Sequence, residues 1–170
     1  MASMADISVL IVDDHMLFAD ALQERLAREP DLRPISVAYN ARDAIDQAAE
    51  TRPAVVIIDV VLDGYRGLDL VEKMLQTSPD SKVVVLTVAE SVDDVVAALA
   101  RGARAWLPKT IDVNHLLRVI RGVECGEAWL APELLGRVLT DFAAARRNRG
   151  QSTYRALVRA RCGRPRSTGG

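Results

Sequence analysis

The sequence is poor in cysteine and lacks any long apolar run. Its two cysteines, Cys125 and Cys162, stand far apart without a CxxC pair or clustered histidines, so neither a disulfide framework nor a cysteine metal site is predicted. No stretch of about 18 apolar residues occurs, which argues against a transmembrane helix. The first apolar run, residues 7–12, ends at two aspartates. A signal peptide is therefore not indicated, and we expect a cytoplasmic protein.

Acidic residues are missing from the C-terminal end of the sequence. Residues 142–170 carry 8 arginines and no Asp or Glu, whereas residues 1–141 carry 23 acidic and 14 basic residues. The formal net charge of -1 therefore conceals an acidic region and a basic one, which indicates two regions with different roles. The arginine-rich composition predicts a disordered tail over residues 148–170, with weak, salt-sensitive contact with nucleic acid or another acidic surface as the alternative.

Strand patterns and helical patterns alternate along most of the chain. Short runs rich in Val and Ile predict strands that are covered on both faces, at residues 7–12, 54–58 and 83–86. Two less apolar segments, residues 34–39 and 103–107, are predicted to be the edge strands. The alternation predicts an α/β fold: a flavodoxin-like doubly wound sheet of five parallel strands in the order 2-1-3-4-5, with an extra C-terminal helix.

Five helical patterns connect or follow the predicted strands. The first has an apolar stripe that we expect to face the core, formed by Leu17, Ala21, Leu22 and Leu26. Ser91 and Asp112 are predicted to cap the fourth and fifth helices. Pro132 suits the first turn of one more helix, so residues 125–147 are predicted to contain a linker helix. Its apolar stripe is expected either to pack on the fifth helix or to pair with another protomer.

A polar signal follows four of the predicted strands. The residues are Asp13 and Asp14 after the first strand, Asp59 after the third, Thr87 after the fourth and Lys109 after the fifth. Taken singly, each has an ordinary explanation, such as an acidic helix start or a turn residue. Their joint placement matters because ligands of such sheets bind outside the carboxyl ends of the strands. The pattern therefore predicts one shared site.

The residue types suit transfer of a phosphoryl group to an aspartate. Close carboxylates repel one another, and oxygen ligands of this kind suit a hard cation such as Mg²⁺. The Thr87 hydroxyl and the Lys109 ammonium would then face the phosphoryl oxygens. We predict Asp59 as the nucleophile because it stands alone after its strand, whereas Asp13 and Asp14 form a chelating pair.

Four motifs at these positions resemble the receiver domain of two-component response regulators: VDDH (12–15), IIDV (57–60), LTV (86–88) and GARAWLPK (102–109). The resemblance covers residues 6–124 and implies four Mg²⁺ ligands, namely Asp13, Asp14, Asp59 and the main-chain carbonyl of Val61. It implies that a sensor histidine kinase phosphorylates Asp59, and that Thr87 and Lys109 bind the phosphoryl group. The rotamer of Trp106 would then respond to Thr87.

His15 and the stretch GEAWLAPEL (126–134) look like the NarL/FixJ subgroup of this family, most of whose members are transcription factors with a LuxR-type helix-turn-helix domain. The residues after Gly150 are too few for such a domain. We therefore expect DNA binding only through an output domain absent from this chain, and the family implies a homodimer on phosphorylation. The alternative is a stand-alone receiver that acts as a phosphate sink or a protein–protein switch.

Enzymes on similar folds are less well matched. An aspartyl-nucleophile phosphatase would need a second Asp two positions after Asp59, where this chain has Val61. No GxGxxG follows a predicted strand, which argues against dinucleotide binding. We therefore predict a phospho-acceptor that assists its own phosphorylation and dephosphorylation. The chain also departs from the family after Asp59, because Asp63 and Arg66 replace the usual Pro and Asp.

Overall fold

The computed structural model describes residues 6–88, 91–131, 134–136 and 138–140, without the side chain of Ile35. The chain divides into two compact units, residues 1–131 and residues 132–170. In the second unit, residues 134–136 and 138–140 are helical. The remainder of the predicted linker helix beyond Ala131 and the predicted tail (148–170) lie outside the described residues. Within the described part of the chain, no helix is long and apolar enough to cross a membrane.

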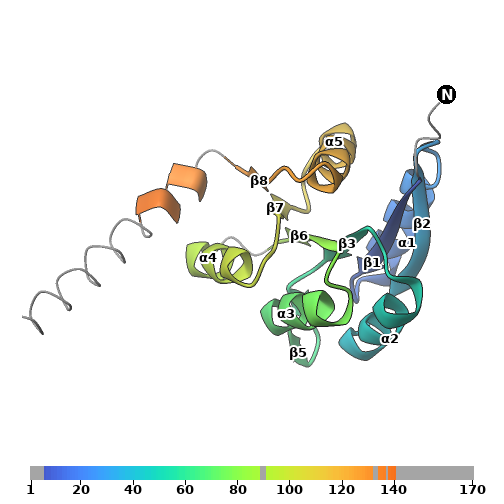
Figure 1. The fold of residues 1–170 in the computed structure, drawn as a ribbon, viewed down its shortest axis with the longest axis horizontal. Helices are drawn as coiled ribbons and strands as arrows, with labels where there is room; N and C mark the ends of the chain where they lie inside the picture. Colours follow the sequence, from blue (N-terminus) through green and yellow to red (C-terminus); the bar gives the residue numbers. More distant parts are fainter. Residues whose placement is uncertain (1–5, 89–90, 132–133, 137, 141–170) are drawn as a thin grey trace, which may run out of the picture. The chain divides into compact units, whose positions relative to one another are not determined.

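The first unit is built on a parallel sheet whose strand order is β2-β1-β3-β6-β7-β8 (Figure 1). Its strands are β1 (Ile7–Val12), β2 (Leu32–Ala38), β3 (Val55–Ile58), β6 (Lys82–Thr87), β7 (Ala105–Pro108) and β8 (Trp129–Leu130). Every neighbouring pair in this sheet is parallel. The predicted doubly wound order of the first five strands is confirmed. The reversal of strand order lies between β1 and β3. The chain passes from β1 to β2 on one side, and β3, β6 and β7 then follow on the other side of β1.

The sixth strand, β8, was not predicted, and it corrects the position of β7. Ala105 pairs with Trp129, and Trp106 pairs with Leu130. The Trp129 N–H also donates to the Arg104 carbonyl oxygen at 2.9 Å. The segment 103–107, which we expected at the sheet edge, is therefore an internal strand. A strand of two residues is too short to show the alternation on which the sequence prediction depends.

Five helices cover the two faces of the sheet (Figure 1): α1 (Met16–Leu26), α2 (Ala41–Thr51), α3 (Gly67–Thr77), α4 (Val92–Ala100) and α5 (Val113–Glu124). Helices α1 and α5 share one apolar cluster with alternate residues of the strands, for example Val9 and Ile11 of β1. Helices α2, α3 and α4 lie on the other face. The predicted caps are confirmed, because the side chains of Ser91 and Asp112 accept backbone N–H groups in the first turns of α4 and α5.

The predicted apolar face of α1 is confirmed at Leu22 and Leu26 but wrong at Leu17 and Ala21, which are exposed. Leu17 is 89% exposed, whereas Ala19, Leu22 and Leu26 are buried. Phe18 is partly buried and packs against the core cluster. Both Leu17 and Phe18 fit helical spacing with Leu22 or Ala21, so the pattern alone could not choose between them. The structure turns Phe18 toward the sheet and leaves Leu17 in solvent.

Candidate functional site

Asp13 and Asp59 lie at the carboxyl ends of the adjacent strands β1 and β3. Each is held by the continuation of the sheet: the Asp13 N–H donates to the Ala38 carbonyl at 3.0 Å, and the Asp59 N–H donates to the Val12 carbonyl at 2.9 Å. The strand ends therefore fix where both carboxylates point. Asp13 is 3% exposed and Asp59 is 1% exposed. Two buried carboxylates side by side require compensating positive charge.

Lys109 supplies positive charge to both carboxylates. Its Nζ lies 2.6 Å from Asp13 Oδ2 and 2.6 Å from Asp59 Oδ2. The backbone N–H of Lys109 donates to the Thr87 carbonyl at 3.0 Å, which ties the end of β7 to the end of β6. Burial by itself lowers the pKa of Lys109, but the hydrogen bonds to Asp13 and Asp59 outweigh burial and hold that pKa above its ordinary value. Lys109 is therefore an ammonium in the neutral pH range.

Asp14 and His15 complete the acidic side of the site. The side chain of Asp14 is 25% exposed, and its Oδ2 accepts the Asp63 N–H at 2.8 Å. Its Oδ1 is buried without a well-aligned hydrogen-bond donor, although His15 Nδ1 lies 3.1 Å away. His15 Nδ1 is also 3.3 Å from Asp13 Oδ1. Sequence reasoning used His15 only as a subgroup marker and missed this contact.

The loop after Asp59 forms a small antiparallel hairpin of β4 (Val61–Leu62) and β5 (Tyr65–Arg66). The Val61 N–H donates to Asp59 Oδ1 at 2.9 Å. Gly67 begins α3 so close to the loop that a Cβ there would lie 2.2 Å from Val60 Cα. Only glycine fits this approach. The hairpin therefore fixes the start of the loop beside Asp59, whereas Asp63 and Arg66 are exposed at its outer part.

Thr87 and Trp106 lie on neighbouring strands and on the same side of the sheet. Thr87 is 1% exposed and Trp106 is 2% exposed. The flanking residues Val84, Leu86, Ala105 and Leu107 face the α1/α5 cluster. Because side chains alternate along a strand, those of Thr87 and Trp106 face the side covered by α2, α3 and α4. This placement gives Thr87 and Trp106 a common environment on that side of the sheet.

The charges of the site leave it negative overall. Asp13, Asp14 and Asp59 contribute three carboxylates, and Lys109 is the ammonium in contact with two of them. One oxygen of Asp14 also remains without an aligned donor. A divalent cation would balance the excess charge, and oxygen ligands of this kind suit a hard metal ion. The residues therefore fit a divalent metal, with His15 as an additional neighbour.

Phe18 is a second residue that the sequence analysis did not assign to the site. The centroid of its ring lies 4.7 Å from Lys109 Nζ. The only signal for it in the sequence was its position in the first turn of a helix that starts directly after the acidic pair. The structure thus brings Asp13, Asp14, Asp59 and Lys109 together as expected, and adds His15 and Phe18 around them.

Comparisons with known proteins show the family to which this chain belongs. A family model described as "Response regulator receiver domain" matches residues 9–121. Response regulator GacA of Pseudomonas protegens is 34% identical over 128 residues, which cover 75% of this chain and 60% of that protein. The nitrate/nitrite response regulator protein NarL of Escherichia coli is 30% identical over 159 residues, covering 91% of this chain and 74% of NarL. The chain therefore spans about 60% of the length of GacA.

Solved structures show the same fold. A crystal structure of a LuxR-family two-component response regulator from Aurantimonas sp. matches with a TM-score of 0.72 at 20% identity, over 80% of this chain and 97% of that one. A response regulator protein from Burkholderia pseudomallei matches with a TM-score of 0.65 at 26% identity, over 71% of this chain and 70% of that one. That crystal structure contains a phosphorylated aspartic acid, a calcium ion and citrate.

Proposed function

This chain belongs to the response regulator receiver domain family, and on that premise we propose that Asp59 accepts a phosphoryl group from a sensor histidine kinase in a Mg²⁺-dependent reaction. The family consists of phospho-accepting signalling domains whose acidic pocket binds a divalent metal. Asp59 and Asp13 are both buried and both lie 2.6 Å from Lys109. The observation that carries the assignment to Asp59 is that Asp13 belongs to a cluster of possible metal ligands with Asp14 and His15, whereas Asp59 stands outside that cluster and keeps its contact with Lys109. Burial fixes the orientation of this carboxylate, and the contact with Lys109 offsets its negative charge.

The reaction follows from what holds each oxygen of Asp59. The Val61 N–H fixes Oδ1, and the Lys109 ammonium contacts Oδ2. An Asp59 oxygen forms the new bond to phosphorus while the bond from phosphorus to the imidazole nitrogen of the donor breaks, and the electron pair stays with that nitrogen. Lys109 then pairs with a phosphoryl oxygen in place of the carboxylate oxygen.

Asp13, Asp14, Asp59 and the main-chain carbonyl of Val61 are the proposed Mg²⁺ ligands. When bound, the metal would supply positive charge to the phosphoryl oxygens and allow a third anion beside two buried carboxylates. The overall negative charge of the site supports this assignment. Asp13 orients Lys109 as well, since its Oδ2 contacts Nζ and its Oδ1 accepts the His15 N–H at 2.9 Å.

Phosphorylation is proposed to change the conformation through Thr87 and Trp106. Thr87 would bind a phosphoryl oxygen, and the rotamer of Trp106 would change as Thr87 moves. Their shared side of the sheet supports this link. Trp106 is fully covered in the described state, so a new rotamer must be accompanied by a rearrangement of the strands or helix beside it.

The output of this switch is proposed to be the regulation of transcription through a DNA-binding domain. The similarity to GacA and NarL supports this role. A homodimer that forms on phosphorylation is part of the same proposal, with size by light scattering as its measurement. The second candidate is a stand-alone receiver that acts as a phosphate sink or a protein–protein switch, and equal size before and after phosphorylation would favour it.

Replacing Asp59→Asn tests the proposed function. Acetyl phosphate with Mg²⁺ should label the wild type with an acid-stable, base-labile phosphoryl group, and the variant should incorporate none, since an amide does not form the acyl phosphate. Asp63→Asn is the matched control, because Asp63 is exposed in the same loop and contributes only its backbone N–H to the site. Undiminished labelling of Asp59→Asn would refute the assignment.

The fluorescence of Trp106 tests the proposed conformational change. In a Trp129→Phe background, beryllofluoride with Mg²⁺ should change the fluorescence of Trp106, and the added Asp59→Asn substitution should remove that response. Chelation of Mg²⁺ should remove it as well. A response that persists after either treatment would show that Trp106 does not report on this site.

A further inference from the structure

The ammonium of Lys109 lies between two kinds of partner. On one side are the carboxylate oxygens of Asp13 and Asp59, each 2.6 Å from Nζ. On another side is the ring of Phe18, with its centroid 4.7 Å from Nζ. This distance lies within the range of a cation–π interaction, and the surroundings are partly desolvated because the Lys109 side chain is 10% exposed. The ring therefore attracts the ammonium, while the hydrogen bonds of the ammonium remain with the carboxylate oxygens.

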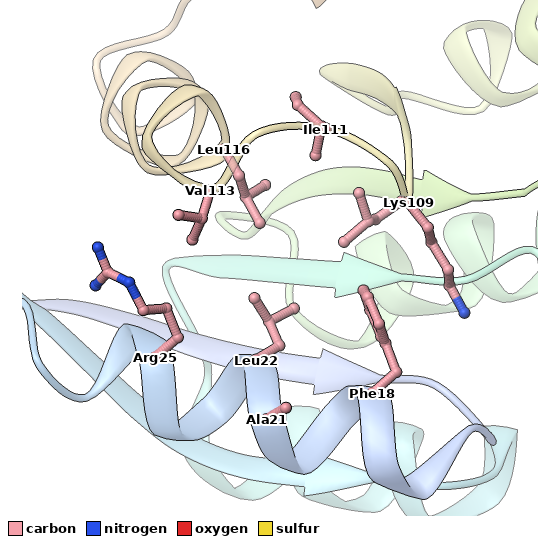
Figure 2. Close-up of a pocket in the computed structure, with 9 residues that line it drawn as sticks. Phe18, Ala21, Leu22, Arg25, Lys109, Ile111, Val113 and Leu116 are labelled. Atoms are coloured by element: carbon pink, nitrogen blue, oxygen red, sulfur yellow. The ribbon is translucent and has the colours of Figure 1, made fainter.

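The aliphatic part of the Lys109 side chain, its stem, borders a cavity, so the Phe18 ring matters for holding the ammonium in place. A cavity of about 230 Å³ lies between α1 and α5, bordered by Phe18, Leu22, Leu86, Lys109 and Leu116 among others (Figure 2). Figure 2 shows Phe18 and Lys109 at the same end of this cavity, with Arg25 at the other end. The stem of Lys109 therefore has open space on its α5 side. A lysine side chain has four flexible carbons, so a free stem can carry its ammonium away from the site.

We propose that Phe18 is a positioning residue that holds the Lys109 ammonium within reach of a phosphoryl group on Asp59. The inference rests on the proposed function and goes beyond it, because it gives a role to a residue outside the acidic cluster. A metal held by Asp13 and Asp59 would compete with the ammonium for their oxygens, and the ring would remain beside the ammonium. Phe18 thereby confines Lys109 to a short movement from carboxylate oxygen to phosphoryl oxygen.

The test compares Phe18→Leu with Phe18→Tyr. Leucine keeps an apolar side chain but removes the ring, whereas tyrosine keeps the ring. Phe18→Leu should weaken beryllofluoride binding, measured with saturating Mg²⁺, by about fivefold, while Phe18→Tyr should stay within about twofold of the wild type. Leu17→Ala is the matched control because Leu17 is the neighbouring residue, is 89% exposed and should leave binding unchanged. Equal weakening by Leu and Tyr would overturn the proposal.

A double-substitution cycle separates positioning from packing. In a Lys109→Met background there is no ammonium to hold, so Phe18→Leu should cause no further loss of beryllofluoride affinity. If Phe18→Leu weakens binding to the same extent in both backgrounds, the ring acts on something other than Lys109 and the proposal is wrong. Thermal unfolding of each variant shows whether a difference in binding comes from a loss of folded protein.

A measurement without any phosphoryl group distinguishes this inference from the proposed function. The ring current of Phe18 should shift the ε-methylene proton signals of Lys109 upfield in the nuclear magnetic resonance spectrum. Phe18→Leu should remove that shift and Phe18→Tyr should retain it. A spectrum in which the Lys109 signals are the same with Leu as with Phe would overturn the inference even if Asp59 is labelled normally, whereas absent labelling of Asp59 refutes the proposed function and leaves this readout intact.

Discussion

Two charged clusters lie at opposite ends of the sheet, and they differ in how their charges are balanced. The acidic cluster, at the carboxyl ends of the strands, consists of Asp13, Asp14, Asp59 and Lys109. The arginine network, at the other end, consists of Arg25, Glu29, Asp31 and Arg121, where Asp31 directly precedes β2 and Arg121 lies in the last turn of α5. The acidic cluster has an excess of negative charge, whereas the arginine network contains equal numbers of acids and bases.

In the arginine network each carboxylate oxygen accepts a hydrogen bond from an arginine. Arg121 contacts Asp31 through Nε at 2.6 Å and through Nη2 at 2.7 Å, and Nη2 also donates to Glu29 at 2.9 Å. Arg25 donates to the other oxygen of Glu29 at 2.7 Å. The hydrogen bond from Arg121 holds the pKa of Asp31 below its ordinary value, and Asp31 and Glu29 raise the pKa of Arg121. These contacts tie the end of α5 to the loop between α1 and β2.

The difference teaches which cluster the protein can use for binding. A network with equal numbers of acids and bases that is partly exposed adds modest stability and needs no additional ion to neutralise it. A buried cluster with excess negative charge lowers stability until a cation arrives, so its folding free energy depends on its ligand. The unbalanced cluster is also the one that we propose as the metal and phosphoryl site.

The largest effect is expected from Lys109→Met. This change removes the ammonium between two buried carboxylates and should lower the free energy of unfolding by about 3 kcal/mol in the absence of divalent metal. Mg²⁺ should restore part of the loss. Urea unfolding with and without Mg²⁺ measures both effects. Lys73→Met is the control, because Lys73 is exposed on α3 and should change stability by less than about 0.5 kcal/mol; a Lys109→Met variant as stable as this control would contradict the prediction.

An intermediate effect is expected from the same substitution made once in each cluster. Asp14→Asn removes one excess negative charge and should stabilise the metal-free protein by about 1 kcal/mol, with weaker metal binding. Asp31→Asn removes a balanced charge that Arg121 contacts twice, and should destabilise the protein by about 1 kcal/mol. Chemical unfolding of the two variants in the presence of a chelator measures whether each change raises or lowers the free energy of unfolding. Two changes of the same sign would remove the contrast between the clusters.

The smallest effect is expected for the pH dependence of the stability lost in Arg121→Gln. Because the folded pKa of Asp31 is lowered, its pairing contributes stability that is fully present above the unfolded pKa and is lost as pH falls through the folded pKa. The stability difference between wild type and variant should therefore be constant above about pH 5 and shrink in more acidic solution. Unfolding curves across this pH range measure it. A difference that grows with acidity would be inconsistent with the pairing.

The sequence was sufficient for the parts of the fold that depend on pattern and order. Apolar runs rich in Val and Ile marked β1, β3 and β6, and the alternation with helices predicted an α/β sheet, for which we took the flavodoxin-like order. Asp13, Asp59 and Lys109 could be placed together because the carboxyl ends of parallel strands share one edge. In each case a local signal and a general rule of sheet geometry were enough.

The remaining features depend on packing that no local pattern shows. Leu17 and Phe18 both fit a helical stripe, and only the docking of α1 on the sheet decides which of them is buried. The short strand β8 gives no alternation to read. His15 looked like a subgroup marker, yet its ring reaches the oxygens of Asp13 and Asp14 because the backbone turns sharply between β1 and α1. The errors at Leu17, Phe18 and His15 therefore concern side-chain direction, whereas the error at β8 concerns a strand too short to recognise.

The short strand β8 has a mechanical consequence. It is joined to β7 through the pairs Ala105–Trp129 and Trp106–Leu130, whereas β1 and β2 pair along six positions. A force applied to the chain after Leu130 therefore loads this two-residue ladder first, and peeling it away leaves the other strands of the main sheet joined. The strand that carries Trp106 becomes the new border of the sheet at that moment. Tension on the chain after Leu130 would therefore act first on the pairs that join β8 to the strand that carries Trp106.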